Sequence, residues 1–374
     1  MIELSIESLS YGGGRGVGRA EGKVFFVPWT APGDVLTAKV TLSKKNYGEA
    51  EMVELLRPSP HRVKPLCPVF GICGGCRFQH ISYEEQLRQK DLYVQKALRF
   101  LPEGVLESIR PCPRPFHYRN RIQLQVRAHE FGFLKMKSNE VVPIDGCPLA
   151  EEPIDRFLGT AEALSALKKT GASKVEVSLS EKGRLMVAAV GATTEESRFS
   201  QVNRFQNDFL IETVLEWAAP LLRESSAASP PLDLYAGAGN FTFPLHEKFD
   251  RPVVAVELSR PSVQKALQKA SAFPKMRFIQ NDVGDFLNSA EAKSFAETDL
   301  VLTDPPREGL SHEVLSGLER LSPRALIHIG CHLMNFARDL QRLKELGYEI
   351  KKVRPLDMFP QTDHVELVAL VVRP

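Results

Sequence analysis

Three cysteines lie close together in the segment CPVFGICGGC, at Cys67, Cys73 and Cys76, in a chain of 374 residues that has six cysteines. Grouped cysteines in a reducing compartment more often bind metal or carry out chemistry than form disulfides. The alternative is a set of buried free thiols. That is our interpretation of the isolated Cys112, because a lone cysteine usually behaves as a small hydrophobic residue. The C-x5-C-x2-C spacing therefore predicts a metal-binding or reactive-thiol site.

A further cysteine and a glutamate occur in apolar runs near the C-terminus. Cys331 ends the run ALIHIGC and is followed by His332, so it is either a reactive thiolate at a strand end or a core residue. Glu366 lies in the apolar stretch VELVAL. Burial there would raise its pKa towards the range that suits a general base, unless it is a paired acid on an edge strand. Both residues are candidates for catalysis.

Three features at successive strand ends indicate a nucleoside cofactor. The segment DLYAGAGN places Gly237 and Gly239 between a strand and a helix, where glycines let the backbone approach a ligand. Glu257 ends the next expected strand and could bind ribose hydroxyls, and Asp282 follows the strand after that, near an adenine edge. The loop lacks the third glycine that is typical of dinucleotide-binding loops, so NAD is the weaker alternative.

The segment DPPREGL, residues 304–310, follows the apolar run LVLT. It places Asp304 at the carboxyl end of a strand, facing the crevice where such sheets bind ligands. The two prolines after Asp304 stiffen the loop, which suits a wall against a planar base. An ordinary loop would explain the prolines but not their position.

The elements that must position these residues change along the chain. After about residue 196, strand-like and helical patterns alternate, which predicts a doubly wound parallel sheet with a closing antiparallel hairpin. The first ~57 residues contain short strand-like runs between glycine turns, as in a small β-barrel. A proline-rich linker, the cysteine segment, a helix and a second β-rich region lie between them.

The charge of the chain is balanced, with 48 lysines and arginines against 46 acids, so a nucleic acid would have to bind a local patch. Residues 111–137 hold six basic residues against one acid, with Phe116, His117 and Tyr118 among them. This composition is typical of single-stranded RNA binding, although a solvated strand face is the alternative. Neither a leader-like start nor an apolar run of 18 residues is present, which predicts a cytoplasmic protein.

Five motifs together resemble the RNA uridine-5-methyltransferase family of the TrmA and RumA type. They are FSQVNRFQN, DLYAGAGNFTFPL, DPPREGL, a cysteine at a strand end, and DMFPQTDHVE. The resemblance covers essentially the whole chain. It implies an α/β fold with a TRAM-like β-barrel (residues 1–58), a central iron-sulfur and RNA-binding domain (59–195) and a Rossmann-like class I methyltransferase domain (196–374).

The resemblance also implies roles for single residues. Cys331 would add to C6 of uracil, and Glu366 would remove the proton from C5 after methylation. The residues expected to bind S-adenosylmethionine are Gln201, Tyr235, Gly237, Asn240, Glu257, Asp282 and Asp304. The ligands expected for a [4Fe-4S] cluster are Cys67, Cys73, Cys76 and Cys147, with zinc as the competing occupant. The residues expected to contact RNA are Arg15 and Arg19, in a flexible loop, and Phe116, Tyr118, Arg119 and Arg121.

The sequence departs from the family beside the nucleophile. Where the usual pattern is Ser-Cys-Asn-Pro, this chain has Gly330, Cys331, His332 and Leu333. A second departure, Ala236 in place of a cysteine, is expected to matter little. The resemblance implies an enzyme that methylates 23S ribosomal RNA, because the transfer RNA enzyme lacks the barrel and the cluster. We also expect a monomer. The alternatives are a transfer RNA methyltransferase and an RNA-binding homologue with impaired catalysis. A small-molecule or protein methyltransferase would leave the barrel unexplained.

Overall fold

The computed structural model describes residues 1–180, 182–192, 201–223, 230–296 and 298–374. Its contacts divide the chain into two compact units. The first comprises Met1–Tyr93, Cys112–Ser197 and Phe359–His364, and the second comprises Val94–Pro111, Arg198–Met358 and Val365–Pro374. The boundary expected between residues 195 and 196 lies outside the described residues. The division into three domains stays a prediction.

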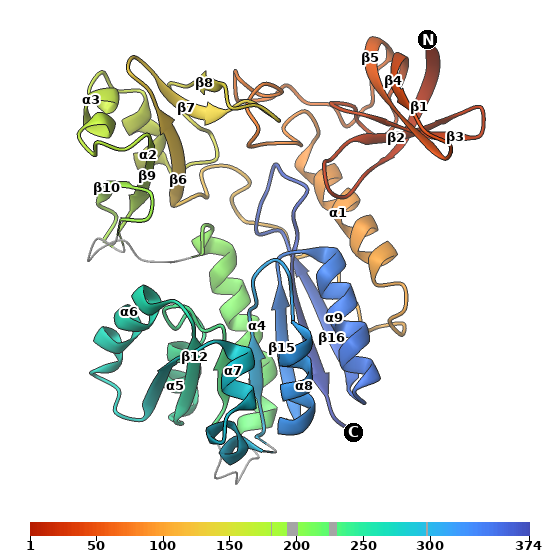
Figure 1. Cartoon of the computed structure of the whole chain (residues 1–374). Coiled ribbons are helices and arrows are strands. Elements are labelled where there is room, and N and C mark those ends of the chain that lie inside the picture. Colours follow the sequence, from red (N-terminus) through yellow and green to blue (C-terminus); the bar gives the residue numbers. More distant parts are fainter. Residues whose placement is uncertain (181, 193–200, 224–229, 297) are drawn as a thin grey trace. The chain divides into compact units, whose positions relative to one another are not determined.

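The N-terminal strands close into a barrel in the order β1-β2-β3-β5-β4 (Figure 1). They are β1 (Ile2–Leu9), β2 (Gly16–Ala20), β3 (Lys23–Val27), β4 (Val35–Ser43) and β5 (Tyr47–Arg57). Along β1, Leu4 and Ile6 are buried between exposed neighbours, as expected of a strand with one face on a core. They pack against Phe25, Val27 and Leu36 inside the barrel. The predicted barrel is therefore confirmed.

The first unit also contains an antiparallel sheet in the order β10-β9-β6-β7-β8. Its strands are β6 (Arg121–Val126), β7 (Phe131–Leu134), β8 (Val141–Pro143), β9 (Lys174–Leu179) and β10 (Leu185–Ala189). Helices α2 (Glu152–Leu158) and α3 (Ala163–Lys168) contribute Ile154 and Leu167 to its core beside Leu124 and Val175. The helix predicted after the cysteine segment is α1 (Tyr83–Ala97).

The second unit is built on a seven-stranded sheet in the order β13-β12-β11-β14-β15-β17-β16. Its strands are β11 (Leu232–Leu234), β12 (Val253–Glu257), β13 (Met276–Gln280), β14 (Val301–Thr303), β15 (Ala325–Gly330), β16 (Glu349–Leu356) and β17 (Glu366–Val372). The first five in this order are parallel, and β17 runs antiparallel to both β15 and β16. The predicted doubly wound sheet with its closing hairpin is confirmed.

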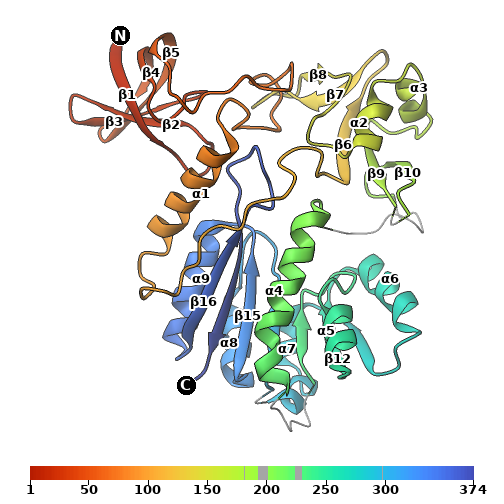
Figure 2. The same ribbon diagram turned by 180° about the vertical axis from the view of Figure 1, so that it is seen from behind.

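Helices cover both faces of this sheet. They are α4 (Arg204–Arg223), α5 (Thr242–Phe249), α6 (Arg260–Ala270), α7 (Val283–Asn288), α8 (His312–Leu321) and α9 (Leu333–Glu345), with a short 3-10 helix at Glu291–Phe295. Helices α7, α8 and α9 lie over one face in Figure 1, and α4 and α5 lie over the other in Figure 2. The strand order reverses at β11 and β14, where sheets of this kind bind ligands beyond the carboxyl ends of the strands. None of the helices within the described ranges is long and apolar enough to cross a membrane.

Candidate active site

The antiparallel pair β15 and β17 brings the candidate nucleophile and base together. Gly330 pairs with Leu367, so the next positions along the two strands are Cys331 and Glu366. Glu366 also pairs with Leu356 of β16 and is 3% exposed, whereas Cys331 is partly exposed. A buried carboxyl group thus lies beside an accessible thiol at one end of the sheet.

The electrostatics of this end of the sheet are dominated by burial and by neighbouring acids. Burial, followed by the charges of Glu366 and Asp304, raises the pKa of Cys331 to about 11 against the opposing effect of Arg307. Burial and the charge of Asp304 raise the pKa of Glu366 well above its usual value. Burial also raises the pKa of Asp304 to about 7. A carboxyl group with a raised pKa is suited to accept a proton near neutral pH.

The loop after Asp304 is held in place by α9. Asn335 donates to the carbonyl of Arg307 at 2.7 Å, and Arg338 donates to the carbonyl of Glu308 at 2.6 Å. The buried Asp339 accepts from the Leu310 N–H at 2.8 Å. Gly309, between these contacts, has a φ of +78°, and a Cβ there would lie 2.2 Å from Asp339 Oδ2. Only glycine fits this close approach.

The altered residues around Cys331 form a consistent local structure. His332 is the N-cap of α9, and its Nδ1 accepts from the Asn335 N–H at 3.3 Å. A side-chain acceptor at this position satisfies one of the free N–H groups of the first helical turn. A Cβ at Gly330 would lie 2.8 Å from the Phe336 ring, which stacks on His328 with ring centroids 5.1 Å apart. Glycine before Cys331 therefore makes room for Phe336.

The predicted cofactor residues meet at the carboxyl ends of β11 and β12. Glu257 Oε2 accepts from the Gly237 N–H at 2.9 Å, which ties the glycine loop to the neighbouring strand. Tyr235 adopts a left-handed backbone with a φ of +63°. Asn240 exchanges two amide hydrogen bonds with Asn207 of α4, at 2.9 and 3.0 Å. The loop is thus fixed from both sides.

The other two residues expected at the cofactor differ in their surroundings. Asp282 is the N-cap of α7, where its carboxylate accepts from the Gly284 N–H at 2.8 Å. Gln201 is partly buried and lies just before α4. Phe199 and Ser200 of the same motif lie outside the described residues.

Sequence reasoning missed Asp233, a fully buried acid in β11. Its Oδ2 accepts from the Thr242 hydroxyl at 2.5 Å, and its Oδ1 has no hydrogen-bond partner. Burial, together with the charges of Asp304 and Glu257, raises the pKa of Asp233 to about 7 against the opposing effect of the Thr242 hydrogen bond. The signal was present in the sequence, since an acid inside an apolar strand is unusual.

Two amides that lead into α4 were also missed. Asn203 donates to the Met358 carbonyl at 3.0 Å, and Gln206 donates to the Asp357 carbonyl at 3.1 Å. They join the motif FSQVNRFQN to the start of DMFPQTDHVE. The middle of that second motif, Phe359–His364, belongs to the first unit, and its last two residues, Val365 and Glu366, belong to the second.

The four cysteines expected to bind a cluster are free thiols in the first unit, all partly buried. The charge of Cys67 acts on both Cys73 and Cys147, and the charge of Cys147 acts on Cys76. The four thiols are therefore close enough to interact electrostatically. Several N–H groups point at the sulfurs, including those of Gln79 at 3.2 Å from Cys76 and of Gly75 at 3.4 Å from Cys73. The described residues include no group of three or more His, Cys, Asp or Glu side chains that could hold a metal ion. Cys112 is buried, as expected.

Two of the residues expected to contact RNA have other roles. Tyr118 is fully buried and donates to the Pro360 carbonyl at 3.0 Å, so the expectation that it stacks on RNA is wrong. Arg119 donates to the Tyr118 hydroxyl at 3.4 Å, and its charge acts on Cys73, Cys76 and Cys147. Because its guanidinium contacts the buried Tyr118 and acts on the thiols, Arg119 is a poor phosphate ligand.

The other four RNA candidates are more accessible. Arg19 is exposed but lies in strand β2, so the expected flexible loop is wrong for this residue. Arg15 forms an ion pair with Glu49 at 2.8 Å. Arg121 lies 3.8 Å from Glu176, and Phe116 is partly exposed.

Comparisons with known proteins agree on one family. Residues 175–373 match the family model described as tRNA (Uracil-5-)-methyltransferase, and residues 1–53 match the TRAM domain. The chain is 40% identical to an uncharacterized RNA methyltransferase of Bdellovibrio bacteriovorus, over 98% of this chain and 94% of that protein. It is 31% identical to the 23S rRNA (uracil(1939)-C(5))-methyltransferase of Pseudomonas entomophila, over 98% of this chain and 92% of that protein.

A solved structure supports the same fold. The tRNA (uracil-54, C5)-methyltransferase of Pyrococcus abyssi, in complex with S-adenosyl-L-homocysteine, superposes with a TM-score of 0.76 at 23% identity. The match covers 99% of this chain and 100% of that one, so it includes the N-terminal barrel. The expectation that a transfer RNA enzyme lacks this barrel is therefore wrong for that protein.

Proposed function

Because the chain belongs to the RNA uracil-5-methyltransferase family, we propose that it transfers a methyl group from S-adenosylmethionine to C5 of a uridine in 23S ribosomal RNA. The observation that carries this proposal is the pairing of Gly330 with Leu367, which places the Cys331 thiol beside the buried Glu366. The ribosomal substrate is supported by the relatives whose printed names state it.

The chemistry assigns a distinct task to each of these two residues. C5 of uracil is a weak nucleophile, so the Cys331 thiolate first adds to C6 and moves electron density onto C5. Bound S-adenosylmethionine supplies the methyl group as an electrophile. Glu366 then accepts the C5 proton, the C5–C6 double bond forms again, and the bond between Cys331 and C6 breaks. A target base in a loop or single strand is the easiest to extrude for this attack.

The cofactor is proposed to lie at the carboxyl ends of β11, β12 and β14. The residues proposed to contact it are Gln201, Tyr235, Gly237, Asn240, Glu257, Asp282 and Asp304. The Glu257 carboxylate accepts from the Gly237 and Ser259 N–H groups, and these contacts orient it toward the glycine loop. Preorganised polar groups of this kind lower the cost of binding.

The four cysteines are proposed to hold a [4Fe-4S] cluster. Four cysteine thiolates suit either a zinc ion or a [4Fe-4S] cluster. The cluster is preferred because the resemblance to the family implies it. Donors to the sulfurs and the nearby charge of Arg119 suit an anionic cluster. Such a cluster would organise a loop-rich segment that has little core of its own.

The accessible residues Arg15, Arg19, Phe116 and Arg121 remain proposed RNA contacts. A monomeric state stays a prediction that sedimentation can check. The alternative of an impaired RNA-binding homologue rested on the residues after Cys331. The N-cap formed by His332 weakens that alternative, because the helix that follows the nucleophile still begins with a side-chain cap.

The proposal is tested by incubating the purified protein with labelled S-adenosylmethionine and total RNA from cells that lack the enzyme. We expect 5-methyluridine in 23S ribosomal RNA, and none with Cys331→Ala. If 5-methyluridine appears in transfer RNA instead, the substrate is transfer RNA and not 23S ribosomal RNA. A wild-type protein that binds the cofactor and RNA but forms no product would favour the binding homologue.

A further inference from the structure

Trp29 adopts a backbone conformation that bulky residues rarely occupy. It lies between β3 and β4 with a φ of +62°, in the left-handed region where glycine is the favoured residue. A strained conformation of this kind persists only when its surroundings fix it, and it is concentrated at functional sites. The question is what an aromatic side chain gains at this position.

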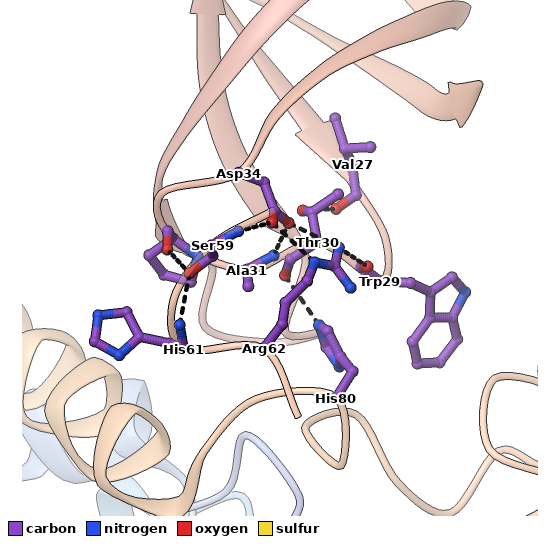
Figure 3. A network of polar contacts seen from close by, with 10 residues as sticks. Val27, Trp29, Thr30, Ala31, Asp34, Ser59, His61, Arg62 and His80 are labelled. Atoms are coloured by element: carbon purple, nitrogen blue, oxygen red, sulfur yellow. Dashed lines mark hydrogen bonds and ion pairs between the residues drawn. The ribbon is translucent and has the colours of Figure 1, made fainter. Parts of the chain in front are cut away.

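The surroundings of Trp29 do fix its backbone (Figure 3). Arg62 donates to the Trp29 carbonyl at 3.0 Å and forms an ion pair of 2.7 Å with the buried Asp34. Asp34 also accepts from the Ala31 N–H at 2.6 Å and from the Ser59 N–H at 2.8 Å. The indole points away from this polar network in Figure 3. The network thus holds the turn while the ring stays outside it.

The ring packs against the cysteine segment instead. The Trp29 and Phe70 rings meet edge to face with centroids 5.1 Å apart. Phe70 in turn stacks on the buried His80, with centroids 5.6 Å apart and an interplanar angle of 29°. Trp29 and Phe70 are both partly exposed. The buried His80 ring therefore packs against Phe70, and Phe70 packs against Trp29, while Trp29 and Phe70 stay partly exposed.

The segment that carries Phe70 exposes large apolar side chains and contains no acidic residue. Val63, Leu66 and Ile72 are 46%, 64% and 49% exposed. Residues 58–83 contain no aspartate or glutamate, and Lys64 in this run is exposed. An accessible aromatic face beside a lysine, without acids in the same segment, suits a nucleic acid base and its phosphate.

We propose that Trp29 and Phe70 form a stacking platform for an unpaired RNA base other than the methylated one, with Lys64 contacting a neighbouring phosphate. This inference rests on the proposed function, because it assumes that the partner is RNA. The platform adds a contact that sequence reasoning did not identify. It explains why a strained tryptophan occupies a position that glycine would fill without strain.

The first test compares Trp29→Gly with Trp29→Phe. Glycine suits the backbone at this position, so Trp29→Gly should fold as the wild type does, which a thermal melt verifies. Binding of an end-labelled single-stranded oligouridylate, measured by fluorescence anisotropy, should weaken roughly 5- to 100-fold in Trp29→Gly, the range for loss of one base-stacking ring. Trp29→Phe should retain most of the affinity. Equal affinity of all three proteins would overturn the platform.

The second test uses the emission of Trp29 itself. The chain has two tryptophans, and the other, Trp217, is 2% exposed. Saturation with the oligouridylate should change the emission of the wild type, because a base stacks on the indole. The same titration should leave the emission of Trp29→Phe unchanged, since only Trp217 remains. Unchanged wild-type emission at saturation would overturn the proposal.

Failure of the platform and failure of the proposed function give different results. If the wild type binds the oligouridylate and methylates RNA, and Trp29→Gly does both equally well, only the platform is wrong. If Trp29→Gly binds RNA normally but loses a protein that copurifies with the wild type, the surface binds protein and the RNA platform is overturned. If the wild type binds no RNA, both proposals fail.

Discussion

Cys331 and Glu366 occupy facing positions at the end of an antiparallel strand pair, one residue beyond the pairing of Gly330 with Leu367. Strand register therefore fixes the distance between thiol and carboxyl group more firmly than two loops could. In the proposed reaction, Cys331 carries out the addition to C6 and Glu366 carries out the removal of the C5 proton. Each step can be stopped by its own substitution.

Replacing Glu366 with Gln should stop the reaction after methylation. Cys331 can still add to C6, but the proton on C5 is no longer removed, so the covalent complex with RNA should accumulate. Turnover should fall by about 10²–10⁴-fold, the usual contribution of a general base. Denaturing gels that resolve the RNA–protein complex, with mass spectrometry of the linked base, check this. Cys331→Ala should form no complex, and normal turnover of Glu366→Gln would exclude the assigned role.

Reactivity of Cys331 should rise with pH. Its pKa of about 11 means that the thiol predominates at neutral pH, so the thiolate fraction increases about tenfold for each pH unit below the pKa. Alkylation of Cys331 by iodoacetamide, followed by mass spectrometry between pH 6 and pH 9, should show this slope. Arg307→Gln removes a charge that lowers this pKa and should slow alkylation at every pH. A rate independent of pH would contradict the buried, acid-flanked thiol.

Gly309→Ala should disrupt the loop that carries Asp304, and Gly347→Ala provides the matched control. Both glycines have a left-handed φ, +78° and +90°, so alanine costs about 1–2 kcal/mol at either position. A Cβ at Gly347 meets no atom within 4 Å, whereas one at Gly309 would lie 2.2 Å from Asp339 Oδ2. Denaturant unfolding should show a clearly larger loss for Gly309→Ala, with weaker S-adenosylmethionine binding by calorimetry. Equal losses would mean that Asp339 moves away freely.

Cys147→Ser should remove bound iron. We expect the purified wild type to contain about four iron atoms for each chain and to show the broad visible absorbance of a cluster. Cys112→Ser is the control, because the buried Cys112 thiol donates to the Arg114 carbonyl and is not one of the four proposed ligands. Iron in Cys112→Ser should match the wild type. If the anaerobically purified wild type contains zinc and no iron, the four cysteines bind zinc and the proposed cluster is wrong.

The sequence was informative where a residue type is unusual for its surroundings. An acid in the run VELVAL and a cysteine at the end of ALIHIGC identified Glu366 and Cys331, because strands buried on both faces read as apolar runs. The carboxyl ends of the strands then predicted that Gly237, Glu257 and Asp304 lie at one edge of the sheet. The parallel order of β12, β11 and β14 confirms this.

The sequence was uninformative where a contact depends on how distant segments pack. Asp339 supports the loop of Gly309 from a helix 30 residues away in sequence, and no local pattern marks it. Asn203 and Gln206 bind carbonyl groups more than 150 residues away. Tyr118 was misassigned because an aromatic residue among arginines can face either solvent or core, and composition does not distinguish them.

The residue after the nucleophile should be replaceable by the one that the family uses. His332 caps α9 through a ring nitrogen that accepts from the Asn335 N–H. Asparagine is a strong N-cap, so His332→Asn should keep the helix and at least the wild-type methyl transfer. His332→Ala removes the acceptor and should cost about 0.5–2 kcal/mol of unfolding free energy. Because α9 also holds Arg307 and Leu310, the same variant should lower methyl transfer more than it lowers S-adenosylmethionine binding. Chemical denaturation and single-turnover methylation of both variants measure these effects. If His332→Ala matches the wild type in both, the cap is dispensable, and the departure from the usual motif then has no structural consequence.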